Sequence, residues 1–336
     1  MEEAGLKKGG SPMPVDLADR QAAFDTHIYS PAHLIARADQ VVNAGYLERC
    51  RAHGLELTVP QLLYLCAVAT NPGGHQAAAA RMIGMDTPTG AFVISALERK
   101  GLVERQPCAT DKRRKTIYCT PKGETARVSG VALFSASTRD FLEPATAADR
   151  RELQRIFEKI AAHDEANPPP LRDASGKPVT VPDYLPAEVL PGYLLGRSLQ
   201  LAAALVAPAL APFDLTIRQY VVLAMLGITG PCNMTLLTRV MGSERSAMAI
   251  VLPTLKKRRL LSINRETDRS LSIALTEGGH ALLSRVRPVA EAANRHIACH
   301  LNQKERELFT RTVAGILNHR GELLRFEDVA QPRSGA

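Results

Sequence analysis

Two short basic segments are the parts of this sequence best suited to binding a polyanion. Residues 99–115 hold seven basic and two acidic side chains, and residues 256–269 hold six basic and two acidic ones. The formal net charge of the whole chain is +8, so these segments account for its excess and the remainder is close to neutral. Clustered Lys and Arg neutralise phosphates. The sequence therefore predicts a polyanion that the protein meets at two places.

Other kinds of chemistry find little support in the residue pattern. The chain has no P-loop, no nucleophile elbow and no zinc-protease motif, so we expect neither an enzyme nor a bound cofactor or metal. Its six cysteines are scattered and are expected to be reduced, mostly buried thiols, with a redox-sensing cysteine as the alternative. Aromatic residues make up only 4%, too few for a platform that stacks single-stranded bases.

The sequence also predicts a cytoplasmic protein without a membrane partner. The N-terminus is polar and lacks the apolar core of a signal peptide. The longest uncharged run, Gln219–Thr238, is interrupted by Gly230-Pro231-Cys232-Asn233. Such a break is typical of helix, turn, helix rather than of a membrane span.

The same series of elements is expected around each basic segment. Pro31 or Pro191 opens a first helix, and Thr58 or Thr216 is placed to cap a second one. A shorter helix ends at Gly84 or Gly242, and the next ends near Gly101 or Arg259. Strands and closing helices are expected at 102–106, 115–120, 122–140 and 146–164, and again at 260–264, 270–276, 277–299 and 302–326. This order is typical of a winged helix-turn-helix, with Arg and Lys in the wing turn.

Direct sequence matches indicate that the series is a tandem repeat. Leu57–Gln61 matches Leu215–Gln219, and Pro31–Arg37 matches Pro191–Arg197. Between the copies, residues 167–191 hold seven of the 22 prolines, which favours an extended spacer. The predicted organisation is a flexible segment at 1–27, a first repeat at 28–164, a linker at 165–187, a second repeat at 188–328 and a flexible tail at 329–336.

Both copies carry a specific set of short motifs in the same order. In the first copy they are Ile83–Thr87, Leu97–Arg105, Thr110–Arg114 and Thr120–Gly123. In the second they are Met241–Ser246, Leu255–Leu261, Thr267–Arg269 and Leu275–Gly279. A recognition helix, an Asp-Arg wing and a Thr-x-x-Gly exit in this order resemble the MarR family of bacterial winged-helix transcription regulators.

The resemblance implies a mainly α fold of two MarR-like winged helix-turn-helix domains, each with a small β-wing and N- and C-terminal dimerisation helices. It also implies sequence-specific binding of double-stranded operator DNA, by a repressor that a small effector releases. A family dimer has two winged helices, so we expect the repeats to pair within the chain as a pseudo-dimer, with homodimerisation as the alternative. The DNA-binding residues implied are Thr87, Thr89, Gly90, Ser95, Lys112, Arg113, Arg114 and Lys115, and then Arg245, Ser246, Lys256, Lys257, Arg265 and Arg269.

A possible effector site lies on the first helix of each copy. His33 and Arg37 are four residues apart and share a helix face, and Tyr193 and Arg197 match them. The segment is similar to the first helix of MarR members that respond to aromatic carboxylates. An Arg can pair with a carboxylate, and a His or Tyr can bond a ring hydroxyl. The alternative is that these side chains only cap the dimer helices or form salt bridges between them.

The chain departs from the family pattern at the recognition helices. Ala91 and Ala249 stand where members often have Arg, and Pro253 is expected to kink or end the second recognition helix. Arg259 replaces the glycine found at Gly101. The two copies are therefore expected to read unequal half-sites. The same departures leave open a winged-helix module that binds proteins instead of DNA.

Overall fold

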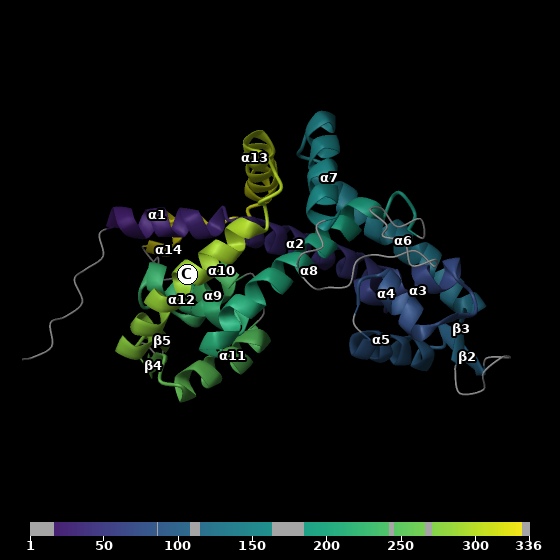
Figure 1. Ribbon diagram of the computed structural model, residues 1–336, viewed down its shortest axis with the longest axis horizontal. Helices are drawn as coiled ribbons and strands as arrows, with labels where there is room; N and C mark the ends of the chain where they lie inside the picture. The colour runs from purple at the N-terminus through teal and green to yellow at the C-terminus, as the bar shows by residue number, and fades with distance from the viewer. Residues whose placement is uncertain are drawn as a thin grey trace, which may run out of the picture.

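The computed structural model describes residues 17–85, 87–107, 115–162, 185–241, 245–265 and 271–330. We call residues 17–162 the N-terminal half and residues 185–330 the C-terminal half. Figure 1 shows two lobes, with the helices α2 (Pro31–Ala52) and α8 (Leu190–Leu210) running between them. Helix α1 (Leu17–Ile28) of the N-terminal half lies on the lobe that the C-terminal half forms. Over these described residues the fold is mainly helical with two small antiparallel sheets.

In the N-terminal half a helical domain carries a small wing. Its elements are α1 (Leu17–Ile28), α2 (Pro31–Ala52), α3 (Val59–Thr70), β1 (Gly74–His75), α4 (Gln76–Met82), α5 (Thr87–Arg99), β2 (Val103–Pro107), β3 (Lys115–Cys119), α6 (Pro121–Leu142) and α7 (Ala147–Ala162). Strand β3 pairs with β2 on one side and with β1 on the other. The wing is thereby tied to the turn that follows α3.

The elements of the C-terminal half come in a similar order. They are α8 (Leu190–Leu210), the short 3-10 helix η1 (Ala211–Phe213), α9 (Ile217–Thr229), α10 (Met234–Met241), α11 (Arg245–Lys257), β4 (Leu261–Arg265), β5 (Leu271–Leu275), α12 (Glu277–His296), α13 (Gln303–His319) and α14 (Glu327–Ala330). Strands β4 and β5 pair with each other, and Cys232 forms a single bridge to Ile273 of β5. That bridge ties this wing to the turn after α9.

Corresponding threonines begin corresponding helices. Thr58 and Thr216 form capping boxes: the Thr hydroxyl accepts from the backbone N–H of Gln61 or Gln219, and the side-chain Oε1 of that Gln accepts from the Thr backbone N–H. At the exit of each wing, Thr120 and Thr276 accept a hydrogen bond from the backbone of the third helical residue. These caps fix the starts of α3, α9, α6 and α12.

The exit helices pack closely on the wing at a glycine. A Cβ added to Gly123 would lie 1.9 Å from the Leu102 carbonyl oxygen, and one added to Gly279 would lie 2.0 Å from that of Leu260. No other residue type fits such a contact. The Thr-x-x-Gly exit therefore has the same packing role in both halves.

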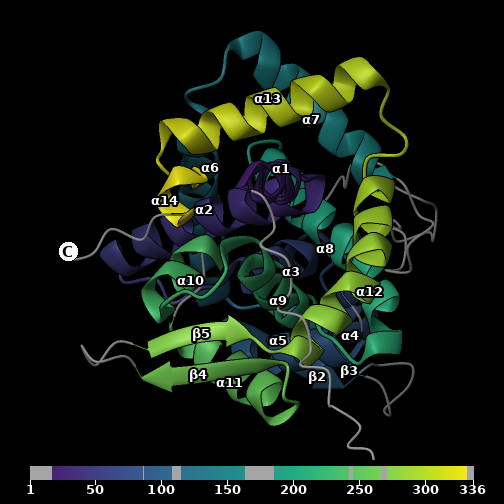
Figure 2. The ribbon, with the colours of Figure 1, turned by 90° about the vertical axis from the view of Figure 1, so that its left-hand side faces the viewer.

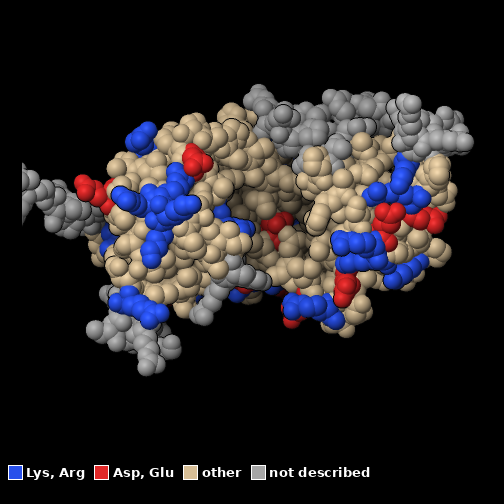
Figure 3. Space-filling model, turned by 90° about the horizontal axis from the view of Figure 1, so that it is seen from below, with Lys and Arg blue, Asp and Glu red and all other residues tan. Residues whose placement is uncertain are grey.

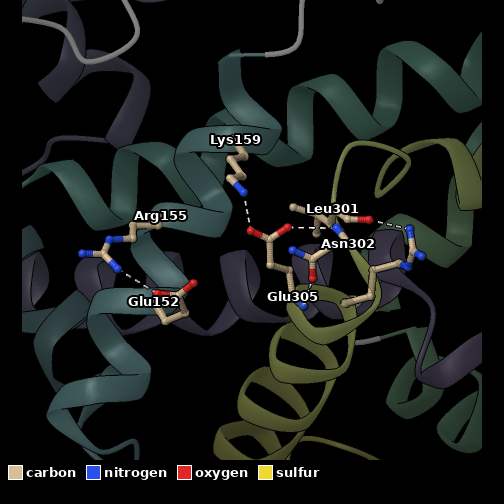
Figure 4. Close-up of polar contacts among 7 residues, drawn as sticks. Glu152, Arg155, Lys159, Leu301, Asn302 and Glu305 are labelled. Carbon is tan, nitrogen blue, oxygen red and sulfur yellow. Dashed lines mark hydrogen bonds and ion pairs between the residues drawn. The ribbon is translucent and has the colours of Figure 1, made fainter.

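One continuous core joins the halves. Helices α2 and α8 contact each other, while α2 also packs on α6 and α13, and α8 on α7 and α12. Figure 2 shows α13 crossing above α2 and α1, with β4, β5 and α11 on the opposite side. Helices α7 and α13 contact each other, and their ends are joined by the Lys159–Glu305 ion pair (Figure 4). Asn302 caps α13: its Oδ1 accepts from the Glu305 N–H, and Glu305 Oε2 accepts from the Asn302 N–H.

Helix α8 is the most membrane-like of the described helices. By length and apolar composition alone, the segment Leu190–Phe213 could cross a bilayer. This is weak evidence, because core helices of soluble proteins pass the same test. In this structure α8 packs against α2, α6, α7, α9 and α12.

The structure corrects the predicted ends of the chain. The expectation of a flexible segment over 1–27 is wrong for residues 17–27, which belong to α1 and bury Phe24. Arg20 of this helix donates a hydrogen bond of 2.7 Å to the Ile228 carbonyl oxygen at the end of α9. The flexible tail expected from 329 is likewise wrong at Val329, which is 1% exposed in α14.

Two helix boundaries also differ from the prediction. Helix α11 continues through Pro253 to Lys257, because both Pro253 and the Ala249 carbonyl four residues earlier lie on the exposed face. Water can satisfy a carbonyl there. Helix α13 ends at His319 instead of near residue 326, and Gly321 at φ 67° turns the chain towards α14.

Candidate nucleic-acid interface and ligand cavities

Helices α5 and α11 both lie on the lower side of the molecule in Figure 1. Figure 3, which views that side, shows separate groups of Lys and Arg on the two lobes with a hollow between them. Among the predicted DNA-binding residues, those with exposed side chains are Thr89, Ser95, Lys115, Lys256, Lys257 and Arg265. The predicted residues Lys112, Arg113, Arg114 and Arg269 lie outside the described residues, as do the side chains of Thr87, Arg245 and Ser246.

Gly90 does not belong to this surface, and its prediction is wrong. The residue is buried, and a Cβ added there would lie 2.6 Å from the Ala80 Cβ. Gly90 thus allows α5 to approach α4 closely. The family resemblance does not reveal which face of the helix Gly90 occupies.

An exposed apolar residue in the middle of α5 and another in the middle of α11 were missed by the sequence analysis. Phe92 on α5 is 72% exposed, and Ile250 on α11 is 75% exposed. Phe92 is followed one turn later by Ser95, whose hydroxyl donates to the Ala91 carbonyl oxygen and accepts from Arg105. The two side chains stand at matching positions of the two helices.

A cavity of about 940 Å³ lies between the halves. Its walls come from α1, α2, α8, α9 and α12, and they include the predicted effector residues His33 and Arg37. The other predicted pair, Tyr193 and Arg197, lines a separate cavity of about 280 Å³ between α2, α3 and α8. The structure therefore puts one predicted pair in each cavity.

Arg37 is already engaged in the large cavity. Its guanidinium forms an ion pair with Glu322, donates to the Glu322 backbone oxygen at 3.0 Å and to Gln40 Oε1 at 2.9 Å. Its side chain is only 17% exposed. These contacts fit the alternative interpretation of Arg37, a salt bridge that holds the C-terminal segment on α2.

Two histidines lie beside each other in the same cavity. The rings of His27 and His33 have their centroids 5.3 Å apart. Burial and the cation of Arg287 lower the pKa of His27 from 6.5 to about 4, and burial, His27 and Arg37 lower that of His33 to about 3. Both imidazoles are neutral at pH 7. His27 lines the cavity as well.

The small cavity holds a carboxyl group rather than histidines. Asp39 lines it and accepts a hydrogen bond of 2.7 Å from Asn43. Burial raises the pKa of Asp39 from 3.8 to about 6, against the opposing effect of the Asn43 hydrogen bond. The two cavities therefore differ in chemistry as well as in size.

The cysteines agree with the expectation of buried thiols in part. Among the five described ones, Cys50, Cys66 and Cys232 are buried, Cys119 is half-buried and Cys299 is exposed, and all five are free. Burial raises the pKa of the Cys66 and Cys232 thiols to about 11, which keeps them protonated and unreactive.

Comparison with known proteins identifies the family. The model of the MarR family matches residues 53–114, from the end of α2 into the wing. The chain is 36% identical over 139 residues to the HTH-type transcriptional regulator YybA of Bacillus subtilis, which covers 38% of this chain and 89% of YybA. The chain belongs to the MarR family of transcription regulators.

Two solved structures are also similar to parts of the chain. One is BpsR of Bordetella bronchiseptica, whose DNA binding is regulated by 6-hydroxynicotinic acid (26% identity, 39% of this chain and 98% of that one, TM-score 0.36). The other is the MarR family protein Rv2887 of Mycobacterium tuberculosis in complex with salicylic acid (29% identity, 40% of this chain and 98% of that one, TM-score 0.33).

Proposed function

We propose that this chain is a repressor that binds double-stranded operator DNA with two winged helices of its own and is released by a small effector. The observation that carries the proposal is the placement of α5 and α11 on one side of the molecule, each followed by a two-stranded wing. Two recognition helices facing the same way can enter successive major grooves of one duplex.

The two halves are proposed to be tandem copies that act as a pseudo-dimer. Their elements follow a similar order, and their caps and exit glycines have matching contacts. Helices α2 and α8, the first long helix of each copy, pack on each other at the centre. Helices α7 and α13 meet in the same way at the ends of the copies. Such contacts inside one chain would replace those between two subunits.

The proposed reading surface is the exposed face of each recognition helix. In α5 it includes Thr89, Phe92 and Ser95, in which the aromatic ring can contact a thymine methyl and the hydroxyl groups can reach base edges. Lys115, Lys256, Lys257 and Arg265, with the wing residues Lys112, Arg113, Arg114 and Arg269, would neutralise phosphates.

A salt titration with matched variants tests the DNA proposal. We expect the duplex affinity of the wild-type chain to fall steeply with salt, because each phosphate contact releases counterions. Arg113→Ala with Arg114→Ala should weaken binding and flatten that slope by about one to two units. Arg155→Ala is the control, because the Arg155 side chain is 71% exposed on α7, away from α5. A wild-type affinity that does not depend on salt would refute the proposal.

A second candidate is a winged-helix module that binds a protein. The exposed Phe92 and Ile250 favour it, as do Ala91 and Ala249 beside them. In that case the Arg113/Arg114 double variant would bind DNA as the wild type does. Loss of DNA binding in that variant, with the Arg155 control unaffected, would favour the repressor.

The effector is proposed to be a small aromatic acid bound between the halves. His33 and Arg37 line the large cavity, and Tyr193 and Arg197 the small one. Salicylate and 6-hydroxynicotinate are the first compounds to test, by their ability to release the chain from a bound duplex.

A further inference from the structure

Building on the proposed response to an effector, we propose that the chain binds one organic anion per molecule, in the large cavity alone. Arg287 and His27 hold its acidic group, and its apolar body is larger than a single ring. The small cavity, which measures about 280 Å³, takes no such ligand. This assigns the anion to residues on α12 and α1 instead of to Arg37.

Arg287 is the cation best placed to receive the ligand. It lines the large cavity from α12, and its cation lowers the pKa of the neighbouring His27. A Cβ added to Gly227 of α9 would lie 3.3 Å from Arg287 Nη2, so the guanidinium lies over that helix. Within the described ranges Arg287 has no hydrogen bond or ion pair, whereas Arg37 is held by Glu322. A guanidinium with open donors can bind a carboxylate through two parallel hydrogen bonds.

The charge of the cavity lining favours an anion overall. Its charged residues are Arg37, Arg218, Arg287 and Arg295, with Glu291 as the acidic one. The charge of Arg37 is neutralised by Glu322. Glu291 stands one turn after Arg287 on α12 and leaves the lining positive, so a bound carboxylate is attracted.

His27 supplies a second polar contact. Its Nε2 atom is shielded from solvent and has no hydrogen-bond partner among the residues that the structure describes. The neutral imidazole can bond an acid or hydroxyl group without adding a charge. A buried polar atom without a partner destabilises a protein, so a ligand that satisfies it gains binding free energy. His27 belongs to α1, which Arg20 fastens to the end of α9.

The small cavity has neither the same space nor the same cation, because side chains of α6 occupy the corresponding positions. Ala290 of α12 stands at the same distance from the cap Thr276 as Phe134 of α6 does from Thr120. Phe134 is 1% exposed, and its ring would lie 2.7 Å from a Cβ on Gly192 of α8. By the same count Val131 replaces Arg287. A ring and an aliphatic side chain thus take the space and the charge that the other half leaves for a ligand.

The size of the large cavity sets the class of ligand. A cavity of about 150 Å³ holds benzene, whereas this one measures about 940 Å³. Much of its wall is aliphatic, from Leu199, Ala202, Ala203, Val206, Val221, Ala224 and Ile228. A fused-ring or long-chain acid fills such a space better than a single ring does.

Calorimetric titration with 2-naphthoate, and with the neutral amide of the same shape, tests the proposal. We expect one naphthoate per wild-type chain and weaker binding of the amide. Arg287→Ala should weaken naphthoate by about tenfold or more and leave the amide unchanged. Arg287→Lys should restore part of the affinity. Asn43→Ala, in the small cavity, is the matched control and should bind as the wild type does.

A second variant tests the cavity without touching the charge. Ala290→Phe introduces the ring that the N-terminal half already accommodates at Phe134, and it should abolish naphthoate binding. Circular dichroism and thermal unfolding check its fold. Two naphthoates per chain, an affinity insensitive to Arg287→Ala, or no binding of naphthoate by the wild type would overturn the proposal. Duplex binding is measured separately. A chain that binds the duplex but not naphthoate would therefore contradict this inference and leave the DNA proposal intact.

Discussion

The two halves build a similar set of elements and differ in what fills the space beneath their first long helix. In the N-terminal half Phe134 occupies that space, and the cavity that remains measures about 280 Å³. In the C-terminal half Ala290 stands at the matching position, beside a cavity of about 940 Å³. The caps and exit glycines that shape the backbone are alike in both. One backbone plan can thus hold either a packed core or a binding cavity, depending on a few side chains.

Removing the ring of Phe134 should have the largest effect on stability. Phe134 is 1% exposed and packs edge-on against Tyr46, so Phe134→Ala should lower the free energy of unfolding by about 3–5 kcal/mol. Ala290→Val, which adds methyl groups next to an existing cavity, should change it by less than about 1 kcal/mol. Urea unfolding of both variants measures the difference. Equal losses would mean that the halves are packed alike.

Titration should reveal opposite pH dependences in the two cavities. The histidines have pKa values lowered to about 4 and about 3, so the unfolded chain binds more protons below pH 6.5. Their contribution to stability is complete above pH 6.5 and is lost as the pH falls towards 4. Asp39, with its pKa raised to about 6, acts in the opposite sense: its folded carboxyl is favoured below pH 4 and loses stability as the pH rises through 6.

Single variants separate these two contributions, each on the order of 3 kcal/mol. His27→Gln should weaken the loss of stability between pH 6.5 and 4, and Asp39→Asn should stabilise the chain above pH 6. Unfolding free energies at pH 4, 5, 6 and 7 check both. If either variant had the same pH profile as the wild type, the side chain that it replaces would be more hydrated than the structure indicates.

The turn that links α5 or α11 to the following wing has a similar backbone conformation in both halves. It therefore offers a further test of the comparison, with a smaller expected effect on stability. Gly101 and Arg259 both have left-handed backbones, at φ 67° and φ 55°. Only glycine adopts this conformation without strain. Arg259→Gly should therefore stabilise the chain by about 0.5–1 kcal/mol, and Gly101→Ala should destabilise it by about 1 kcal/mol. Thermal unfolding measures both, and shifts of the same sign would contradict the matching geometry.

Helices α5 and α11 should respond unequally to removal of their exposed apolar residues. Phe92→Ala should leave stability within about 0.5 kcal/mol, because the side chain is 72% exposed, and should weaken specific DNA binding by several-fold. Ile250→Ala should have less effect on DNA, since it removes a smaller contact. Competition binding with thymine-to-uracil duplexes, which lack the methyl groups, checks the reason. Unchanged DNA affinity in both variants would favour a protein partner at this face.

Local sequence signals predicted most of the backbone plan. Threonine caps, turn glycines and the alternation of helix and strand act over a few residues, so Thr58, Gly84 and Thr276 could be interpreted directly. Features that depend on distant contacts could not. Helix α1 is ordered through Arg20 and the end of α9, and Arg37 is occupied by Glu322, far along the chain.

The candidate site was predicted less completely than the fold. His33 and Arg37 were placed on one helix face, and both do line a cavity. The sequence gives no sign that Arg287 and His27 join them, because α1 and α12 lie at opposite ends of the chain. Gly90 and Pro253 were misjudged for a related reason. The role of each depends on whether its face of the helix is buried or in water.

The mass of the protein, alone and on DNA, tests the central claim most directly. If the two halves form the DNA-binding pair within one chain, light scattering should give a mass near 36.4 kDa for the free protein, independent of concentration. The complex with a duplex carrying one operator should contain a single chain. A free mass of two chains, or two chains on one operator, would contradict the pseudo-dimer.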